Sequence, residues 1–205
     1  MYDQVISNLL EYYNRDAERR DNREYPAWKR EERHHLLSML QQEGKTSLLE
    51  IGAGTGRDSQ FFQEQGLDVI STDLSPEMAK RCRQKGLTAY VMDFLHLDFP
   101  PDSFDAIYSF NCLLHVPTQD LPAVLQKIQG LLKPGGLFYL GAYGGIEREE
   151  AQPDDPNEPK RFFSFHTDEY MQGITRQYFE LLYFKSIPAE READLHFQSI
   201  ILRRS

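Results

Sequence analysis

The glycine-rich segment at residues 48–56 constrains the fold of this 205-residue chain more than any other feature. It reads Leu-Leu-Glu-Ile-Gly-Ala-Gly-Thr-Gly, so an apolar run passes directly into three alternating glycines and then into a helical pattern. Glycine adopts positive φ without strain, and it lets a ligand lie against the backbone because it has no Cβ. The segment therefore predicts a strand, a tight turn and a helix. On its own it is also compatible with a tight turn of purely structural role.

Short apolar runs and helical patterns alternate along the chain after this turn. The predicted strands are residues 47–51, 68–72, 88–92, 104–110 and 136–142, and the predicted helices between them are 58–65, 76–84 and 121–131. Such alternation is typical of an α/β protein with a parallel sheet. Two further strand-like runs, 179–186 and 195–203, are separated by a connection too short for a crossover helix, so we expect them to be antiparallel.

The chain is predicted to divide at residue 46. Residues 1–45 contain two helical stretches, 4–20 and 27–42, and are expected to form an N-terminal helical cap, whereas 46–205 form the α/β domain. Residues 147–160 are rich in Glu, Asp and Pro and predict a long exposed loop.

Acidic residues mark the ends of three successive predicted strands. Asp73 ends the second strand about twenty residues after the glycines, where a carboxylate can accept both hydroxyls of a ribose. Asp93 ends the third strand, and Glu50 lies near the end of the first. Three acids repel a pyrophosphate but suit a ligand that carries an amino group, a sulfonium and a ribose. This placement favours a nucleoside sulfonium over a nicotinamide dinucleotide.

These segments together resemble the class I S-adenosylmethionine-dependent methyltransferases, particularly those with a methyltransferase-11 or -25 type domain. The matching pieces are residues 49–56, 72–78, 93–94, 104–109, 114–117 and 131–136. The resemblance implies a three-layer Rossmann-like fold with strand order 3-2-1-4-5-7-6 and strand 7 antiparallel. It implies S-adenosylmethionine as the cofactor and S-adenosylhomocysteine as the product.

The resemblance also implies cofactor contacts for a set of residues at the carboxyl ends of the strands: Glu50, Gly52, Ala53, Gly54, Asp73, Leu74, Met78, Asp93, Phe94 and Ser109. It places Gly52 and Gly54 against the methionine part of the cofactor and Ser109 beside the sulfonium. It assigns Asp73 to the ribose hydroxyls and Asp93 to the adenine amino group.

Two residues are candidates for contact with the methyl acceptor. Methyl transfer from a sulfonium is an in-line displacement that positioning alone can promote, so a general base is not compulsory. His115 follows the fourth predicted strand and is suited to accept a proton, although histidine at that position more often caps a helix or packs. Tyr143 follows the fifth strand at the same edge. Tyr12, Tyr13 and Trp28 lie in the predicted cap, which in similar enzymes folds over the cofactor.

The composition limits the substrates, metals and membrane contacts that can be expected of this chain. The net charge is −9 and no basic stripe is present, which disfavours a nucleic-acid substrate and favours a small molecule methylated at O, N or C. The only two cysteines, Cys82 and Cys112, have no metal-ligand spacing, so no metal is expected. The sequence shows neither a secretory signal nor an apolar run long enough for a membrane span. We expect a cytoplasmic monomer or homodimer.

Two alternatives stay open at this point. A non-catalytic module that binds S-adenosylmethionine or its product would show the same cofactor residues. An NAD(P)-dependent oxidoreductase is disfavoured by the G-x-G-x-G spacing and by the Leu-Lys-Pro-Gly-Gly run at residues 132–136.

Overall fold

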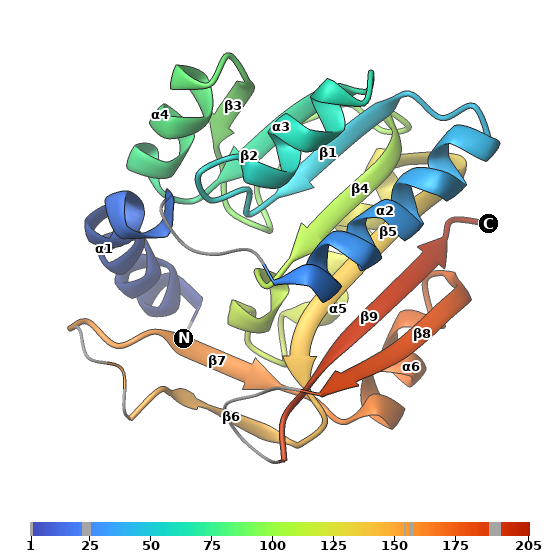
Figure 1. Ribbon diagram of the computed structural model, residues 1–205. Helices are drawn as coiled ribbons and strands as arrows, with labels where there is room; N and C mark the ends of the chain where they lie inside the picture. Colours follow the sequence, from blue (N-terminus) through green and yellow to red (C-terminus); the bar gives the residue numbers. More distant parts are fainter. Residues whose placement is uncertain (1, 22–25, 154, 156–157, 189–193) are drawn as a thin grey trace.

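The computed structural model describes residues 2–21, 26–153, 155, 158–188 and 194–205. Its centre is a seven-stranded sheet in the order β3-β2-β1-β4-β5-β9-β8 (Figure 1). The strands are β1 (Ser47–Ile51), β2 (Asp68–Asp73), β3 (Thr88–Val91), β4 (Phe104–Phe110), β5 (Leu132–Gly144), β8 (Glu180–Pro188) and β9 (His196–Arg203). The first five strands in this order, from β3 through β2, β1 and β4 to β5, pair in parallel. Strand β9 runs antiparallel to both of its neighbours, β5 and β8. The predicted fold, including the antiparallel end of the sheet, is confirmed.

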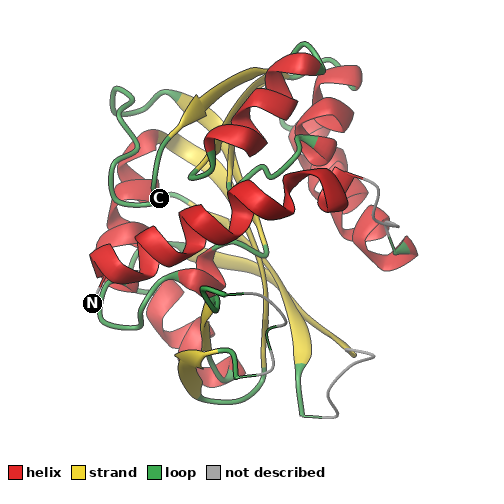
Figure 2. Ribbon diagram, turned by 90° about the vertical axis from the view of Figure 1, so that its left-hand side faces the viewer, coloured by secondary structure: helices red, strands yellow, loops and turns green. Residues whose placement is uncertain are grey.

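Helices cover both faces of this sheet, as the edge-on view shows (Figure 2). On one face, α2 (Ala27–Gln42) and α3 (Arg57–Glu64) bury Leu36 and Phe62 against Leu48 of β1. On the other face, α5 (Leu121–Leu131) and α6 (Asp168–Thr175) pack with Leu49. Leu48 and Leu49 bury on opposite faces because side chains alternate along a strand. The continuous apolar run of β1 follows from burial on both faces.

The two N-terminal helices occupy different places. Helix α2 belongs to the core layer described above, whereas α1 (Tyr2–Asp21) lies beyond the carboxyl ends of the strands, beside α4 (Pro76–Gln84) (Figure 1). The predicted bounds of α2 match those observed, and α1 extends slightly beyond its predicted range at both ends. Of these two helices, α1 alone covers the edge at which the glycine turn opens.

The prediction of a loop over residues 147–160 is wrong for its first residues. Strand β6 (Arg148–Ala151) pairs antiparallel with β7 (Phe162–Phe165) in a small second sheet, and residues 154, 156 and 157 lie outside the described residues. The sequence Arg-Glu-Glu-Ala lacks an apolar run, so its strand depends on a partner that supplies one. The Arg148 guanidinium lies 4.9 Å from the centre of the Phe165 ring. Helix α6 is a further element that the sequence patterns do not predict; Thr167 caps it by accepting from the Tyr170 N–H at 3.2 Å.

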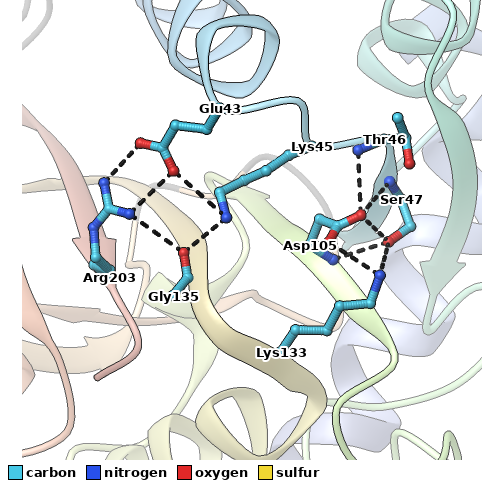
Figure 3. A network of polar contacts seen from close by, with 8 residues as sticks. All are labelled: Glu43, Lys45, Thr46, Ser47, Asp105, Lys133, Gly135 and Arg203. Atoms are coloured by element: carbon cyan, nitrogen blue, oxygen red, sulfur yellow. Dashed lines mark hydrogen bonds and ion pairs between the residues drawn. The ribbon is translucent and has the colours of Figure 1, made fainter.

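A polar network holds the opposite, amino edge of the sheet together (Figure 3). The Asp105 carboxylate accepts from the Ser47 N–H at 3.0 Å and hydroxyl at 2.8 Å, and pairs with Lys133 at 3.0 Å. Partial burial alone would raise the pKa of Asp105, but these donors hold it well below its usual range. Arg203 of β9 pairs with Glu43 at 2.7 Å. The chain between α2 and β1 is thereby tied to β4, β5 and β9, which leaves the carboxyl edge as the open end.

Candidate functional site

The three glycines after β1 all adopt left-handed backbone conformations, but for different reasons. A Cβ on Gly52 (φ 69°) would lie 2.4 Å from the Cβ of Cys112, and one on Gly56 (φ 81°) 2.5 Å from a methyl carbon of Leu87. A Cβ on Gly54 (φ 58°) would meet no atom within 4 Å. Gly52 and Gly56 are therefore required by packing, whereas Gly54 faces open space at the carboxyl edge.

Asp73 ends β2 directly beside Gly54. One carboxylate oxygen accepts from the Gly54 N–H at 2.8 Å, and the other from the Ser75 N–H at 2.9 Å. Burial raises the pKa of Asp73 to about 6, against these two hydrogen bonds that lower it. No ion pair to Asp73 is present within the described part of the chain. An enclosed carboxylate of this kind, next to space over a glycine, suits a ligand that brings hydrogen-bond donors or positive charge.

Asp93 lies just past the end of β3, at the same edge. Its carboxylate accepts from the N–H groups of Leu95 and His96, and contacts the His96 imidazole at 2.7 Å and the Tyr2 hydroxyl at 3.3 Å. Asp93 is therefore held within its own turn and by α1. Phe94 beside it is buried against the core.

Leu74 and Met78 flank Asp73 on the side of α4. Met78 is buried, Leu74 is half-buried, and Ala53 donates its N–H to the Thr72 carbonyl at 2.9 Å. These residues bring apolar surface to the edge between β1 and β2, where the resemblance places the adenosine part of the cofactor.

Two residues predicted to contact the cofactor, Glu50 and Ser109, have side chains that hydrogen-bond to other residues of the protein. Glu50 accepts from the Ser59 hydroxyl of α3, and burial together with Asp58 raises its pKa well above the ordinary value. The Ser109 hydroxyl lies 2.9 Å from the sulfur of Cys112, and the whole residue is buried. The structure thus places Glu50 where it orients the helix after the glycine turn, and Ser109 behind the turn. Their predicted cofactor contacts stay predictions.

Helix α1 crosses the carboxyl edge of the sheet and forms hydrogen bonds to residues that follow β3, β2 and α4. The pairs are Tyr2 with Asp93 (3.3 Å), Asn14 with the Ser75 hydroxyl (2.6 Å) and Asp21 with Lys85 (2.5 Å). Lys85 also donates to the Thr55 carbonyl of the glycine turn at 2.9 Å. Sequence patterns give no sign of these partners because each pair joins residues far apart in the chain. The helix therefore covers the space beside Gly54 and Asp73.

His115 ends the short 3-10 helix η1 (Leu113–His115) and is buried beneath α1. Its Nδ1 donates to the Phe162 carbonyl at 2.6 Å, so Nε2 accepts from the Tyr13 hydroxyl at 2.6 Å. Burial lowers the pKa of His115 to about 3 and raises the pKa of Tyr13. Both ring nitrogens are occupied and the imidazole is neutral, so neither nitrogen is available to a ligand while these two bonds are kept. The sequence indicates Tyr13 only as part of the cap.

Tyr143 near the end of β5 belongs to an aromatic cluster with Trp28, Phe110 and Phe197. Ring centres lie 5.4 Å apart for Tyr143 and Phe197, and 4.7 Å apart for Trp28 and Phe197. Phe197 is buried, whereas the other three are half-buried. The cluster forms an apolar wall beside the end of β4, on the side away from Asp73.

The segment that leads into β7 contacts α1 and completes the cover. The Arg161 guanidinium lies 4.5 Å from the centre of the Tyr12 ring and pairs with Asp155 at 2.6 Å. Arg15 of α1 donates to the Glu158 carbonyl at 2.8 Å. Helix α1 and the chain leading into β7 are therefore coupled.

Neither a metal-binding cluster nor a membrane-spanning helix is found among the residues that the structure describes. That part of the chain holds no group of three or more His, Cys, Asp or Glu side chains suited to a metal ion. It also holds no helix that is both long and apolar enough to cross a bilayer.

Comparison with known proteins connects this geometry to a family. The family model of a methyltransferase domain (Methyltransf_25) matches residues 48–136, from β1 to the start of β5. Over 153 residues the chain is 34% identical to malonyl-[acyl-carrier protein] O-methyltransferase of Hamiltonella defensa, covering 71% of this chain and 58% of the relative. Over 154 residues it is 29% identical to sterol 24-C-methyltransferase of Candida albicans, covering 71% of this chain. The chain spans 39% of the latter's length.

The fold has solved counterparts as well. The crystal structure of Burkholderia thailandensis 1,6-didemethyltoxoflavin-N1-methyltransferase, with 1,6-didemethyltoxoflavin and S-adenosylhomocysteine bound, superposes with a TM-score of 0.77. The two sequences are 24% identical, and the match covers all of this chain and 89% of that one. At this level of identity the likeness shows a shared fold.

Proposed function

The chain carries a class I S-adenosylmethionine-dependent methyltransferase domain, and from this premise we propose that the protein transfers a methyl group from S-adenosylmethionine to an O, N or C atom of a small molecule. The observation that carries the proposal is the pair formed by Gly54 and Asp73. Gly54 leaves open space at the carboxyl edge, and Asp73 presents a carboxylate without an ion pair from the described residues beside it.

The residues at this edge fit the cofactor. The carboxylate of Asp73 suits two ribose hydroxyls because each oxygen keeps a lone pair after accepting one backbone N–H. The apolar surface of Leu74 and Met78 suits the adenine, and Asp93 lies at the next strand end. Negative charge at Asp73 and Asp93 suits a cation and opposes a pyrophosphate.

The protein's own contribution to the reaction is positioning in a covered site. S-adenosylmethionine supplies an electrophilic methyl group on a sulfonium. Helix α1 and the chain before β7 exclude water, which strengthens every charge interaction at the edge. Tyr13, whose hydroxyl donates to neutral His115, presents its hydroxyl oxygen to an N–H or O–H of the acceptor and so orients it. Tyr143 and its aromatic cluster offer apolar surface to the acceptor.

The remaining expectations are part of the same proposal. Of residues 1–45, the predicted cap, α1 covers the site and is the part that moves when ligands enter, whereas α2 stays packed in the core layer. The protein acts as a cytoplasmic monomer or homodimer on a small molecule, and its net charge of −9 disfavours nucleic acid as the substrate.

Calorimetry and thermal shift with four ligands test the proposal. S-adenosylmethionine and S-adenosylhomocysteine are expected to bind with micromolar or tighter affinity and to raise the melting temperature, whereas NAD and NADP give no heat. A metabolite-extract screen for methyl transfer then identifies the acceptor. Saturable binding of NAD without binding of S-adenosylhomocysteine overturns the proposal. Tight cofactor binding with no methyl transfer from any extract favours the non-catalytic module.

We expect α1 and residues 158–165 to gain protection from hydrogen exchange together when cofactor binds. The two segments are coupled through Arg15 and Glu158, and both lie over the edge where ligands enter such sheets. Helix α2 is the internal control, because it is packed in the core layer and should exchange equally in both states. Equal exchange of α1 in the free and bound protein would show that it is not a lid.

A further inference from the structure

Two arginines and two tyrosines lie together where α1 runs beside β7 (Figure 1). The Arg20 guanidinium lies 4.6 Å from the centre of the Tyr13 ring, and the Arg161 guanidinium lies 4.5 Å from the centre of the Tyr12 ring. The two tyrosine rings are 5.4 Å apart. These four residues form an arginine–tyrosine cluster, in which the rings hold two guanidinium groups from different parts of the chain against one helix.

The cluster adjoins the hydroxyl that the acceptor is proposed to contact. The Tyr13 hydroxyl donates to His115 at 2.6 Å. Burial lowers the pKa of His115, and the charges of Arg161 and Arg20 lower it further. Arg20 also opposes the rise that burial causes in the pKa of Asp73. The two guanidinium groups therefore act on the acceptor side of the site, and Arg20 acts on the proposed ribose acid as well.

The guanidinium groups are only partly engaged by carboxylates of the protein. Within the described residues, Arg161 donates to Asp155 through Nε at 2.6 Å, and Arg20 donates to Asp16 through Nε at 2.9 Å. Asp16 also pairs with Arg19 at 2.5 Å, so one carboxylate serves two guanidinium groups. The terminal nitrogens, which bind carboxylates and phosphates through paired hydrogen bonds, lie outside these contacts. The side chains of Arg161 and Arg20 stay 20% and 27% exposed, so a ligand can reach them.

The charge of the cofactor gives these arginines a consequence. S-adenosylmethionine brings a sulfonium to a covered site that already holds two guanidinium groups nearby. Positive charges repel one another more strongly when water is excluded, so the complete assembly is stable only when negative charge joins it. The remaining component, the acceptor, can supply that charge.

We propose that the methyl acceptor carries net negative charge, and that Arg161 and Arg20 bind its carboxylate or phosphate group while its reacting atom faces Tyr13. This proposal rests on the proposed function and names the class of its acceptor. Arginine suits both anionic groups because its planar fork matches their oxygen atoms. A merely structural Arg161 would tie the chain before β7 to α1 and leave the choice of acceptor unaffected.

The test separates a metabolite extract on an anion-exchange resin at pH 8. With S-adenosylmethionine, the protein is expected to methylate a component of the retained, anionic fraction and nothing in the flow-through. The same fraction should raise the melting temperature of the protein saturated with S-adenosylhomocysteine, which records binding without turnover. Treating the fraction with alkaline phosphatase distinguishes the two anions, because loss of both effects assigns a phosphate monoester and persistence assigns a carboxylate.

Arg161→Gln and Arg20→Gln test the two guanidinium groups separately. At limiting amounts of the anionic fraction, methyl transfer should fall about tenfold or more in each, and recover as the fraction is increased, because charged hydrogen bonds to the acceptor are lost. Arg161→Lys keeps the charge without the paired geometry and should give an intermediate rate. Arg20→Gln leaves Asp16 paired with Arg19, so this variant keeps its fold even where the buried Asp155 destabilises Arg161→Gln.

Arg148→Gln is the matched control. The Arg148 guanidinium lies 4.9 Å from the centre of the Phe165 ring and pairs with Glu150 at 3.4 Å, on β6 rather than beneath α1. This variant should respond to the anionic fraction as the unaltered protein does.

Three results overturn the inference while the proposed function stands. They are methyl transfer to the flow-through alone, no effect of the anionic fraction, and a loss of melting temperature in Arg161→Gln and Arg20→Gln without a changed response to that fraction. Failure of the unaltered protein to bind S-adenosylhomocysteine overturns the proposed function itself.

Discussion

Replacing Gly54 by valine is expected to abolish binding of S-adenosylmethionine and S-adenosylhomocysteine while the protein stays folded. A Cβ at this position meets no protein atom within 4 Å, so the valine side chain extends into the volume proposed for the methionine part. Its φ of 58° is strained for a β-branched residue, which costs roughly 1–2 kcal/mol of stability. Calorimetry with both ligands and a melting curve without ligand measure the two effects separately.

Gly44→Val is the matched control for this variant. Gly44 lies in the turn before β1 with φ 65°, and a Cβ there would likewise meet no atom within 4 Å, but the position is at the amino edge of the sheet. Both variants should lose similar stability, and only Gly54→Val should lose binding. Retained affinity in Gly54→Val would refute a ligand role for this turn. Gly52→Ala differs from both, because its Cβ would collide with Cys112 and the fold itself is expected to suffer.

Asp73→Ala is expected to weaken S-adenosylmethionine binding by about tenfold to a thousandfold. Two hydrogen bonds from ribose hydroxyls to a charged acceptor contribute roughly 3–6 kcal/mol together, and water that enters the vacated space restores about half of this. We therefore expect the lower half of the stated range. The variant also loses the acceptors for the Gly54 and Ser75 N–H groups, so its melting temperature without ligand falls as well.

Thr167→Ala separates stability from affinity in this experiment. It removes the side-chain cap of α6, which costs about 1 kcal/mol, at a helix outside the proposed cofactor site. We expect it to lower the melting temperature and to keep the affinity. If Asp73→Ala behaves like Thr167→Ala, then Asp73 serves only to hold its own turn.

The pH dependence of binding gives Asp73 a second signature. With its pKa raised to about 6 by burial, Asp73 is ionised at pH 7.5, so affinity should be flat above pH 7 and fall by up to about tenfold per unit below pH 6. The folded pKa exceeds the unfolded value of 3.8, so protonation stabilises the free protein as pH falls from 6 to 4. Affinity and stability therefore move in opposite directions with pH. Both contributions should disappear in Asp73→Asn, and a persisting affinity step would assign it to another group.

Much of the sheet could be read from the sequence because its signals are local. A glycine turn, an acid about twenty residues later and alternating apolar runs each depend on neighbours within one βα unit. The short connection before β9 likewise determined its antiparallel direction. Strand β6 could not be recognised, because its charged residues become a strand only when paired with β7.

The site was predictable at the level of strand ends and not at the level of side-chain direction. Asp73 lies beside the glycine turn, at the strand end where the sequence placed it. Glu50 and Ser109 also lie near their predicted strand ends, yet packing directs their side chains toward Ser59 and Cys112.

The sequence by itself therefore determined the order of elements, the glycine turn and the acids at the strand ends, since each is encoded by residues close together in the chain. The tertiary structure decided which N-terminal helix covers the site and which atoms face it. The bond from Tyr13 to His115 joins residues 102 positions apart, and no local preference specifies it. Such contacts arise from the packing of α1, η1 and β7 against one another, because only the folded chain brings their side chains within hydrogen-bond distance.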